Sequence, residues 1–550
     1  TVHSFLMPDD VDVIVVGSGP SGAQAAQTLV EQGCTVTLLD VGLESSDDQS
    51  LPAGRSFVEL RHGDPAQHNY FLGPNFEGVP LRPLVAAPQV TPPRRHVIGT
   101  AAGHVPIEGG HFAAIESHAL GGLGSAWGAV SFPYLDLELE RSGLVPSQIR
   151  PSYERIARRI GICGARDDLT AVRGPLEVLQ PPLIRDHNAT GVIATYARKR
   201  KRLQRQRLYV GDPMLAALSI PQDGRAAHAG HDLDFWANPG DSVYRPEQTI
   251  RALQRRANFS YQGGWRVESF AENDRDRVVV TAVSKDGAIH REFRARRLVL
   301  AAGALGTTRI VLRSLQAVDR PVPLVCNAHL YVPCIHLRQL GKPHAERCHS
   351  LAQLTMIYDP TGDRGHLVQA QMYSYRSLLL FRLLKEAPLP QREALWIMRG
   401  LAPSFVVWAI EHEDEPSSQS FCRLRSDGVL EAVHPTHPDV EQKRRRDESA
   451  MMRGMRRLGC WPIRRVHSGP GSSLHYGGQF PPSELESPLT TDGTGRLRNT
   501  RAVHIVDGAA LRYLPAKGLT LTLMANADRV ALAIAAGLRG IQFAQPGTRE

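Results

Sequence analysis

The chain has 550 residues, of which 42% are hydrophobic and 22% are charged, and its formal net charge is +9. This composition excludes a disordered or fibrous protein, and the length suits several domains of roughly 100–200 residues each. The apolar run from Leu401 to Ile410 is far shorter than the roughly 20 residues that a membrane-spanning helix needs, so we expect no transmembrane segment.

The cysteines and the first residues of the sequence give evidence about the cellular compartment of the protein. The cysteines are scattered along the chain and odd in number, which argues against a disulfide framework. The cysteine pattern therefore favours the reducing cytoplasm. The opening stretch TVHSFLMPDDVD lacks the basic and apolar regions of a secretory signal, although a chain that starts at Thr1 could already be processed. Cysteines and histidines gather between Cys326 and His349, but the paired CxxC spacing of zinc sites is missing there, and we predict no metal site.

The positive charge is concentrated in two runs, Arg198 to Arg207 and Lys443 to Arg465. No recognised binding motif accompanies them and few aromatic residues lie near them, so we predict no nucleic-acid partner. Solvated helix faces are one explanation of the runs. The mixed apolar and basic segment from Ser374 to Gly400 leaves two others open, an anionic or lipid-linked substrate and a peripheral membrane contact.

A glycine-rich turn follows the first predicted strand. The β-branched run from Val11 to Val16 is typical of a buried parallel strand, and Gly17, Gly19 and Gly22 follow it with GxGxxG spacing. Gly17 permits a tight turn, Gly19 lets the backbone approach a pyrophosphate, and Gly22 lets the next helix pack against the strand. The helix N-terminus would supply amide hydrogens and a partial positive charge for phosphates.

A second strand and an acidic residue complete this unit. The predicted helix ends near Gly33, and the strand CTVTLLD ends at Asp40, which is placed to accept hydrogen bonds from a ribose. A lone GxGxxG can be a chance turn. Strand, helix, strand and terminal acid together predict a dinucleotide-binding Rossmann fold.

Further motifs narrow the cofactor. The stretch ALGGLGSAWGAVSFPY (119–134) is a second glycine-rich loop, and RLVLAAGALGTTRIVLRS (297–314) is a strand that ends in Ala-Ala-Gly before a helix. Near the C-terminus come GSSLHYGG (471–478) and HIVDGAA (504–510). In this order the motifs resemble those of the glucose-methanol-choline (GMC) family of FAD-dependent oxidoreductases, nearest its pyranose-oxidase-like branch.

The resemblance implies an α/β fold with two interleaved domains. A Rossmann-like FAD-binding domain would comprise residues 1–145, 225–320 and 468–550. An α+β substrate-binding domain, which contains an antiparallel sheet, would comprise residues 146–224 and 321–467.

The resemblance also implies which residues bind FAD. In the family the middle glycine-rich loop lies along the flavin, and the acid of the HIVDGAA motif lies near the diphosphate and ribityl chain. Besides the N-terminal motif, the corresponding positions are Gly121, Gly122, Ser125, Trp127, Ala302, Gly303, Asp507 and Thr520. The pyranose-oxidase-like branch has a histidine covalently joined to the flavin, but Ala126 stands at that position, and we therefore predict non-covalent FAD.

The run from Leu519 to Leu538 predicts a helix independently of the resemblance. Its first turn would aim amide dipoles at the flavin pyrimidine carbonyl and stabilise the negative charge that develops there on reduction. Thr520 and Thr522 would flank this place, although hydroxyl side chains are also ordinary at a helix start.

A histidine in the GSSLHYGG motif is the candidate base. His475 corresponds to the family histidine that faces flavin N5 and takes the proton of a substrate hydroxyl while hydride leaves the same carbon. Imidazole suits this role because its unperturbed pKa of about 6.5 leaves it largely neutral and basic at working pH. The resemblance therefore implies oxidation of an alcohol, with sugars, glycosides or other polyols favoured by the branch.

One departure from the family concerns the second catalytic group. The family has an Asn or a second His before the last helix, and Gly518 stands at that position. Glycine has no side chain to hydrogen-bond the substrate oxygen, so Lys517 or a residue of the substrate-binding domain would have to replace it. Two alternatives stay open: a redox-neutral flavoenzyme such as a lyase, isomerase or cyclase, and a FAD-binding protein without catalysis.

Overall fold

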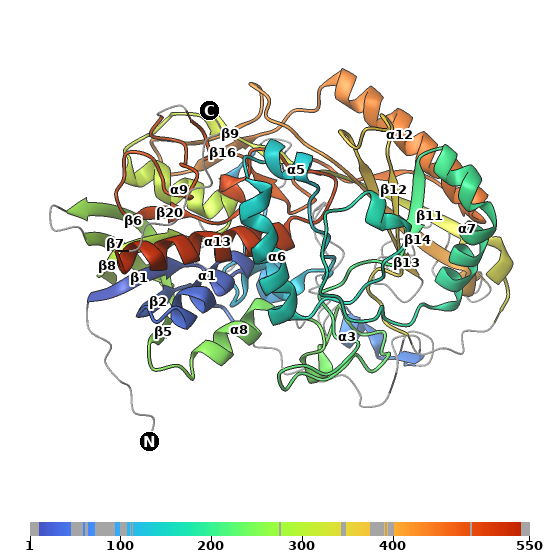
Figure 1. Cartoon of the computed structure of the whole chain (residues 1–550), viewed down its shortest axis with the longest axis horizontal. Helices are drawn as coiled ribbons and strands as arrows, with labels where there is room; N and C mark the ends of the chain where they lie inside the picture. The colour runs from blue at the N-terminus through green and yellow to red at the C-terminus, as the bar shows by residue number, and fades with distance from the viewer. Residues whose placement is uncertain are drawn as a thin grey trace.

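Two seven-stranded sheets organise the chain, one at the left and one at the right of Figure 1. The computed structural model describes residues 10–45, 55, 59–60, 64–71, 94–98, 107–109, 112, 114–273, 277–342, 348–374, 390, 393, 401–484 and 487–540.

The first sheet contains the predicted N-terminal strand. Its strands are β1 (Asp10–Val16), β2 (Val36–Leu39), β5 (Phe259–Gln262), β6 (Trp265–Asn273), β7 (Arg277–Ser284), β8 (His290–Leu300) and β20 (Val503–Ile505). They lie in the order β5-β2-β1-β8-β7-β6, and β20 pairs with the end of β8 beyond β7. The strands β5, β2, β1, β8 and β20 are parallel, while β7 and β6 add an antiparallel edge.

Helices cover both faces of this sheet. On one face α1 (Pro20–Glu31) and α13 (Thr520–Leu538) pack beside each other, and on the other lies α9 (Ala304–Ser314) (Figure 1). Along β1, Val13 and Val15 face α1 and α13, whereas Ile14 and Val16 face α9. A strand that is buried on both faces consists of a continuous apolar run. This run is the reason that β1 could be predicted from the sequence. The sheet and these helices form a Rossmann-like core.

The helix α13 is long and apolar enough to cross a membrane, and it is the one such helix in the described ranges. Its position in the fold accounts for this composition, because 72% of the apolar stretch is buried inside the protein. There α13 packs against α1 and against α6 (Pro146–Ile160). A helix enclosed in this way carries apolar residues on nearly every side.

The second sheet is antiparallel throughout. Its strands are β4 (Leu208–Gly211), β11 (Ala328–His336), β12 (Leu354–Tyr358), β13 (Val368–Ser374), β14 (Phe405–His412), β17 (Cys460–Pro462) and β18 (Val466–His467). They lie in the order β17-β11-β14-β13-β12-β4, with β18 also paired to β11. One face packs against α7 (His187–Arg205) and α12 (Pro438–Arg457).

Side chains alternate between the two faces of the second sheet. On β13, Val368, Ala370 and Met372 pack beneath α7 and α12, whereas Gln369 and Gln371 face the other way, into a cavity. The other residues of this sheet that line the cavity are His329 and Tyr331 of β11, Tyr373 of β13, and Ala409 and Glu411 of β14. The period of two therefore gives the sheet one apolar face and one largely polar face.

Two smaller sheets and several helices complete the described fold. One sheet has the order β3-β16-β15-β9, with β3 (Ile107–Glu108), β9 (Val322–Pro323), β15 (Phe421–Leu424) and β16 (Leu430–Val433). The other pairs β10 (Val325–Cys326) with β19 (Tyr476–Gly477), which brings His475 close to the start of β11. The remaining α-helices are α3 (Gln67–Phe71), α4 (Arg95–Ile98), α5 (Asp136–Arg141) and α8 (Pro246–Leu253).

The strands follow the predicted division of the chain. All strands of the first sheet fall in residues 1–145, 225–320 and 468–550, and all strands of the second fall in 146–224 and 321–467. The four-stranded sheet crosses this division, because β3 belongs to the first set of segments and its other strands to the second. The domain boundaries themselves stay a prediction.

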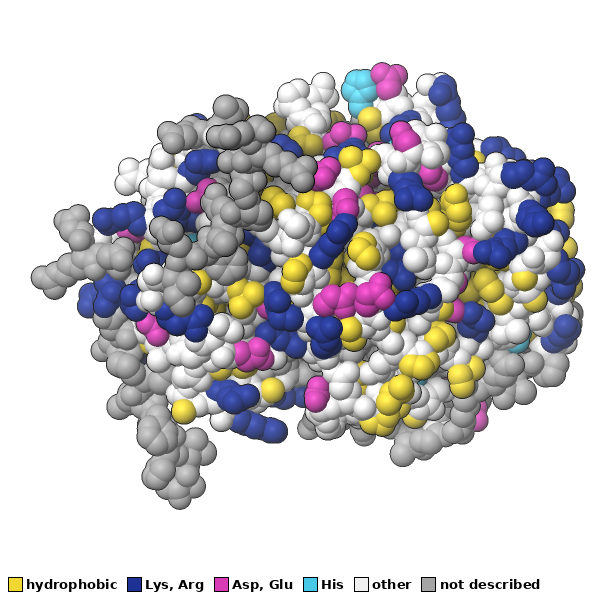
Figure 2. Space-filling model, viewed as in Figure 1, with side chains coloured by type: hydrophobic (Ala, Val, Ile, Leu, Met, Phe, Trp, Pro, Cys, Tyr) yellow, Lys and Arg dark blue, Asp and Glu magenta, His cyan; other side chains and the backbone are white. Residues whose placement is uncertain are grey.

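Most residues of the two basic runs lie on α7 and α12, the helices at the outside of the second sheet. Residues 198–202 on α7 are exposed, and dark blue side chains are frequent at that end of Figure 2. Exposed basic side chains of this kind are expected on a helix face that contacts solvent. The segment from Ser374 to Gly400, which suggested a membrane contact, lies outside the described residues apart from Ser374, Pro390 and Glu393.

Candidate active site

A cavity of about 390 Å³ is lined by residues of both large sheets. Ligand sites commonly have this size and occur where two domains meet. The predicted site residues that line it are Gly17, Gly19, Asp40, Gly122, Trp127, Ala302, Gly303, His475, Asp507, Gly518 and Thr520. Four other predicted residues, Gly22, Gly121, Ser125 and Lys517, are not part of this lining.

Close backbone packing explains the first glycine motif. A Cβ on Gly22 would lie 1.9 Å from the carbonyl oxygen of Gly17, and a Cβ on Gly17 would lie 2.4 Å from that of Ala301. Gly17 also has a φ of 97°, a left-handed conformation that other residues disfavour. Gly19 is the N-cap of α1, and the start of this helix lines the cavity. The helix therefore presents a partial positive charge to an anionic ligand group.

Asp40 lies at the end of β2, in the wall of the cavity. Its carboxylate accepts a hydrogen bond from the Ser18 hydroxyl, whose oxygen accepts the backbone N–H of Gly121 at 2.8 Å. Burial raises the pKa of Asp40 to about 7, although its hydrogen bonds act in the opposite direction. Gly121 thus links the second glycine-rich loop to the first without lining the cavity.

The second glycine-rich loop forms a short 3-10 helix, Gly122–Ala126. Trp127 follows it along the cavity wall, and its indole N–H donates to the carbonyl oxygen of Tyr244 at 2.8 Å. Ser125 turns away, because its hydroxyl lies 2.7 Å from Oε2 of Glu247. Ser125 therefore stabilises the loop rather than lining the cavity.

Ala302 and Gly303 connect β8 to α9 in the cavity wall, and Asp507 lies beside them. The Asp507 carboxylate accepts hydrogen bonds from the Thr307 hydroxyl at 2.5 Å and from the Ala509 N–H at 3.0 Å. Burial raises the pKa of Asp507 to about 6, against the effect of these hydrogen bonds. The buried carboxyl is a polar group that a ligand with hydroxyls can contact.

The start of α13 faces the cavity, as the sequence predicts. Leu519 is the N-cap of this helix, no side chain caps it, and both Leu519 and Thr520 line the cavity. The first-turn amides are therefore available to a ligand. Thr522 points elsewhere, with its hydroxyl 2.7 Å from that of Tyr153. A Cβ on Gly518 would lie 3.1 Å from the carbonyl oxygen of Val130, so a larger residue would be crowded there.

Lys517 does not line the cavity. Its Nζ lies 2.8 and 2.6 Å from the two carboxylate oxygens of Glu138, and its side chain is fully buried. Burial lowers the pKa of Lys517, while the charge of Glu138 opposes this change. The ion pair joins α5 to the segment before α13, and this placement does not support the substrate contact that we predicted for Lys517.

His475 lies where the loop before β19 meets the second sheet. Its Nδ1 is 2.6 Å from Oε1 of Glu411 and 3.2 Å from Oδ1 of Asn327. The Asn327 amide is oriented by its Nδ2, which donates to the carbonyl oxygen of His412 at 2.7 Å. Both neighbours of Nδ1 are therefore acceptors. It follows that Nδ1 carries the proton and that Nε2 is the acceptor nitrogen of the ring.

Glu411 connects His475 to a second histidine. Its Oε1 is 3.6 Å from Nε2 of His329, and the rings of His329 and His475 lie edge to face with centroids 5.7 Å apart. Burial raises the pKa of Glu411, but the hydrogen bond from His475 and the positive charge that either histidine carries when protonated outweigh it and hold this pKa well below its usual range. Glu411 is therefore an anion beside both imidazole rings.

Sequence reasoning missed this group. Glu411 and Asn327 were not singled out, and His329 was counted only among the histidines and cysteines between Cys326 and His349. The alternation of side chains along β11 and β14 is visible in the sequence and would place each residue on a face. The register that sets His329 opposite Glu411 is not visible there, because it depends on the pairing of distant strands.

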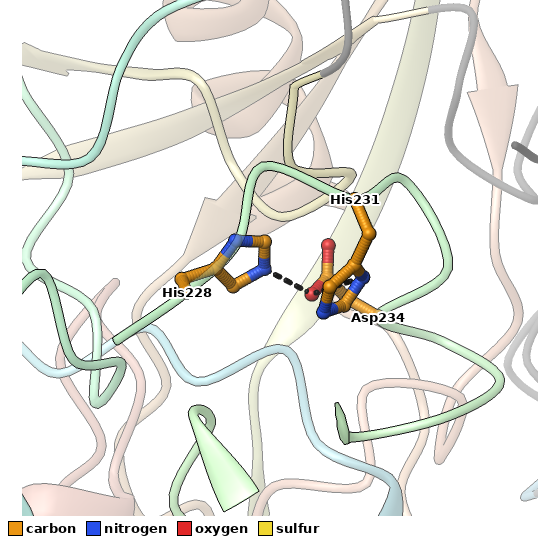
Figure 3. A group of neighbouring side chains, drawn as sticks. All are labelled: His228, His231 and Asp234. Atoms are coloured by element: carbon orange, nitrogen blue, oxygen red, sulfur yellow. Dashed lines mark hydrogen bonds and ion pairs between the residues drawn. The ribbon is translucent and has the colours of Figure 1, made fainter. Parts of the chain in front are cut away.

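A second group of histidine and carboxylate side chains lies outside the cavity, in the loop before α8 (Figure 3). Nε2 of His228 is 2.6 Å from Oδ1 of Asp234, and the rings of His228 and His231 stack with centroids 4.3 Å apart. Burial raises the pKa of Asp234, but the hydrogen bond and charge of His228 outweigh it and lower this pKa. Nδ1 of His228 accepts the Gly230 N–H, and Oδ2 of Asp234 accepts the Ser350 hydroxyl at 2.8 Å. These bonds join the loop to the segment at Ser350.

Two proteins of similar sequence are oxidases. Paromamine 6'-oxidase from Streptomyces fradiae is 24% identical, and the alignment covers 96% of this chain and 92% of that protein. The 6'''-hydroxyparomomycin C oxidase from Streptomyces lividus is 26% identical with the same coverage of both chains. No family model matches the sequence.

Two solved structures share the fold. Pyridoxine 4-oxidase from Mesorbium loti has a TM-score of 0.55 and 15% identity, with 95% of this chain and 98% of that chain covered. A FAD-dependent oxidoreductase from Chaetomium thermophilum has a TM-score of 0.58 and 12% identity, with 97% and 100% covered. The ordered motifs, the Rossmann-like core and these similarities along nearly the whole chain identify the protein as a FAD-dependent oxidoreductase, and its motifs resemble those of the glucose-methanol-choline family.

Proposed function

We propose that this protein oxidises an alcohol carbon of a small polyhydroxylated substrate with non-covalent FAD, and that His475 is the general base. The observation that supports this most strongly is the orientation of the His475 ring. Glu411 and Asn327 both accept at Nδ1, so Nε2 is the nitrogen that can take a proton. A base whose tautomer is set in advance needs no rearrangement before the reaction.

The described residues suit FAD. Gly17, the start of α1 and Asp40 line one part of the cavity, and His475 lines another part of its wall. We infer that the first of these parts holds the adenine dinucleotide portion and that the start of α13 faces the flavin ring. Bound FAD would supply the acceptor for the hydride that leaves the carbinol carbon. Ala126 offers no side chain for a covalent flavin link.

His475 and Glu411 have different roles in proton removal. Nε2 accepts the proton of the substrate hydroxyl, and the ring becomes an imidazolium held between the substrate and Glu411. The Glu411 carboxylate stabilises this positive charge, in the way that a buried carboxylate supports the base of a hydrolase triad. Glu411 itself stays ionised, because its pKa is held low.

His329 is our candidate for the missing second group. Gly518 has no side chain to offer, but His329 lines the same cavity with its ring centroid 5.7 Å from that of His475. An imidazole N–H at this place would hydrogen-bond the substrate oxygen as it loses its proton. The glycine at position 518 motivates the redox-neutral alternative, and a role of His329 as the second group would argue against that alternative.

The similar proteins favour a small-molecule alcohol. Two of them are named for the oxidation of paromamine and of 6'''-hydroxyparomomycin C, and a structural neighbour is named for oxidation of pyridoxine. Each of these proteins is named as an oxidase of a small molecule. We propose the same general class of substrate for this chain.

Anaerobic mixing with candidate alcohols tests the proposal. Purified protein should bind FAD reversibly, and an accepted alcohol should bleach the flavin absorbance band. His475→Ala should keep the absorbance of bound FAD and lose at least 100-fold in the rate of bleaching, since general bases contribute roughly 10²–10⁴-fold. The exposed His467 provides a control, and His467→Ala should bleach at the normal rate. Near-normal bleaching of His475→Ala would refute the role of the base. Product formation without bleaching would support a redox-neutral enzyme instead.

A further inference from the structure

Two glutamines on β13 face the cavity with unsatisfied amide groups. Gln369 is only 1% exposed, and neither Nε2 nor Oε1 has a hydrogen-bond partner among the residues that the structure describes. Gln371 uses its Oε1 to accept from the Thr355 hydroxyl at 2.7 Å, but its Nε2 has no partner in the same part of the chain. Both side chains line the cavity.

Such an arrangement is costly for a protein. Buried amide groups normally have hydrogen-bond partners, because removal from water without compensation is unfavourable. An apolar residue would fill either position on a strand interior without this cost, as the apolar side chains on the opposite face of β13 do. Because Gln369 and Gln371 also line the cavity, their amides point to a ligand whose own polar groups complete these hydrogen bonds.

The strand register places the glutamines relative to the base. Gln369 is paired with Glu411 of β14, which is paired in turn with His329 of β11, so these three side chains form one row across the sheet. Gln371 belongs to the next row, opposite Ala409. Rows on one face are separated by about 6.8 Å, the rise of two strand residues. The Ala409 side chain is small, which leaves room between Gln371 and Tyr331 of the same row.

We propose that Gln369 and Gln371 form a subsite that binds the hydroxyl groups of a sugar-like ring next to the carbon that is oxidised. This inference rests on the proposed function and assigns the residues that select its substrate. A carboxamide has both donors and an acceptor, which matches a hydroxyl group that can do the same. The distance between the two rows corresponds to the width of a six-membered ring with its substituents. The subsite is neutral, so it recognises hydroxyl groups irrespective of any charge elsewhere on the substrate.

The subsite explains discrimination as well as binding. A site built to hydrogen-bond a hydroxyl rejects an analogue without it far more strongly than an apolar pocket rejects a missing methylene, because its buried polar groups are then left unpaired. A simple alcohol such as benzyl alcohol would leave both amides unsatisfied. A glycoside with several ring hydroxyls would satisfy them.

Binding to a variant without turnover tests the subsite. The FAD-loaded His475→Ala protein would be titrated calorimetrically with paromamine, with and without the added substitution Gln369→Met, which preserves shape and removes the amide. We expect the Kd for paromamine to rise at least tenfold with Gln369→Met. The thermal midpoint without paromamine should stay the same or rise, because an unpaired buried amide has been removed. A purely structural role of Gln369 would lower the midpoint instead.

A matched control is available in Gln479. It is also fully buried, but it lies beside Cys422 and outside the cavity. Gln479→Met should leave the Kd for paromamine unchanged. With His475 intact, Gln369→Met should lower kcat/KM for paromamine at least tenfold more than for benzyl alcohol.

Two results would overturn the subsite: an unchanged Kd with Gln369→Met, or equal losses with paromamine and benzyl alcohol. Failure of the proposed function would look different, because the unsubstituted enzyme would then show no bleaching with any alcohol. Calorimetric binding to the His475→Ala protein does not depend on turnover, so the two failures are distinguishable.

Discussion

Oε1 of Glu411 lies 2.6 Å from Nδ1 of His475, so the candidate base comes from the C-terminal segment and the carboxylate that orients it comes from the second sheet. The pair is separated by 64 positions in the sequence. It meets only because β19 pairs with β10 directly before β11, the strand that lies next to β14. The proposed chemistry therefore depends on the two-stranded sheet that holds the C-terminal segment against the start of β11.

Replacement of the Glu411 carboxylate should slow proton removal. Glu411→Gln keeps the size of the side chain and removes the charge that would stabilise a protonated His475. We expect the rate of anaerobic flavin bleaching to fall roughly 100-fold, within the range attributed to base catalysis. The amount of bound FAD should not change. The exposed Glu415 serves as a control, and Glu415→Gln should bleach at the normal rate. A normal rate of bleaching for Glu411→Gln would show that the Glu411 carboxylate does not assist proton removal.

His329 can be tested with two substitutions that differ in hydrogen-bonding capacity. His329→Leu removes every polar atom, and we expect it to lower kcat at least 100-fold, as removal of a single oxyanion donor does in other enzymes. His329→Asn retains an N–H donor and should recover activity to within about tenfold of the unsubstituted enzyme. Stopped-flow reduction at several pH values measures both. Equal losses in the two variants would show that hydrogen bonding by His329 is not what matters.

Gly17 should be required for flavin retention. In Gly17→Ala the new Cβ would meet the Ala301 carbonyl at 2.4 Å, and the turn that approaches the cofactor must shift. We expect a protein that is colourless after desalting. Gly33→Ala is the matched control, since Gly33 also has a positive φ of 85° but nothing lies within 4 Å of its Cβ position. This control should lose about 1 kcal/mol of stability and remain yellow. Equal FAD content in both variants would contradict the prediction.

The stability of the region around His366, between β12 and β13 of the second sheet, should fall at alkaline pH. Burial lowers the pKa of His366, but hydrogen bonds to Asp447 and Glu413 outweigh it and raise this pKa to about 9. The folded pKa thus lies above the unfolded value of about 6.5, so the stabilisation is complete below pH 6.5 and is lost as the pH rises through 9. The loss should be on the order of 2 kcal/mol.

Thermal midpoints at pH 6 and pH 10 measure this effect. His366→Gln removes the titrating group, so the difference between the two midpoints should be smaller in the variant than in the unsubstituted protein. Identical differences would show that His366 does not carry the effect.

Local motifs explain why part of the fold could be predicted. The turn at Gly17, Gly19 and Gly22 follows a strand and precedes a helix within a single short segment, so sequence order and spatial order agree. His475 and Asp507 could be named because they lie in motifs with a family resemblance. All of these residues line the cavity or shape its wall.

Long-range pairing explains what could not be predicted. His329, Glu411 and Gln369 share a row only after three strands of the second sheet have paired in register, and no motif marks them. Lys517 and Ser125 were predicted to contact ligands but do not line the cavity, although their neighbours in the sequence do. The side chain of Lys517 contacts Glu138, and that of Ser125 contacts Glu247. Which way a side chain turns depends on partners that the local sequence does not name.

Strand β8 binds β1 along one edge and, along the other, first β7 and then β20. The backbone of β8 therefore holds both β1 and β20, two strands that are far apart in the sequence. During translation, β1 and α1 emerge long before β20 and α13 exist to cover them. We expect flavin uptake to be a late event that awaits the synthesis of α13, so that a chain ending before Thr520 would expose apolar surface and fail to bind FAD.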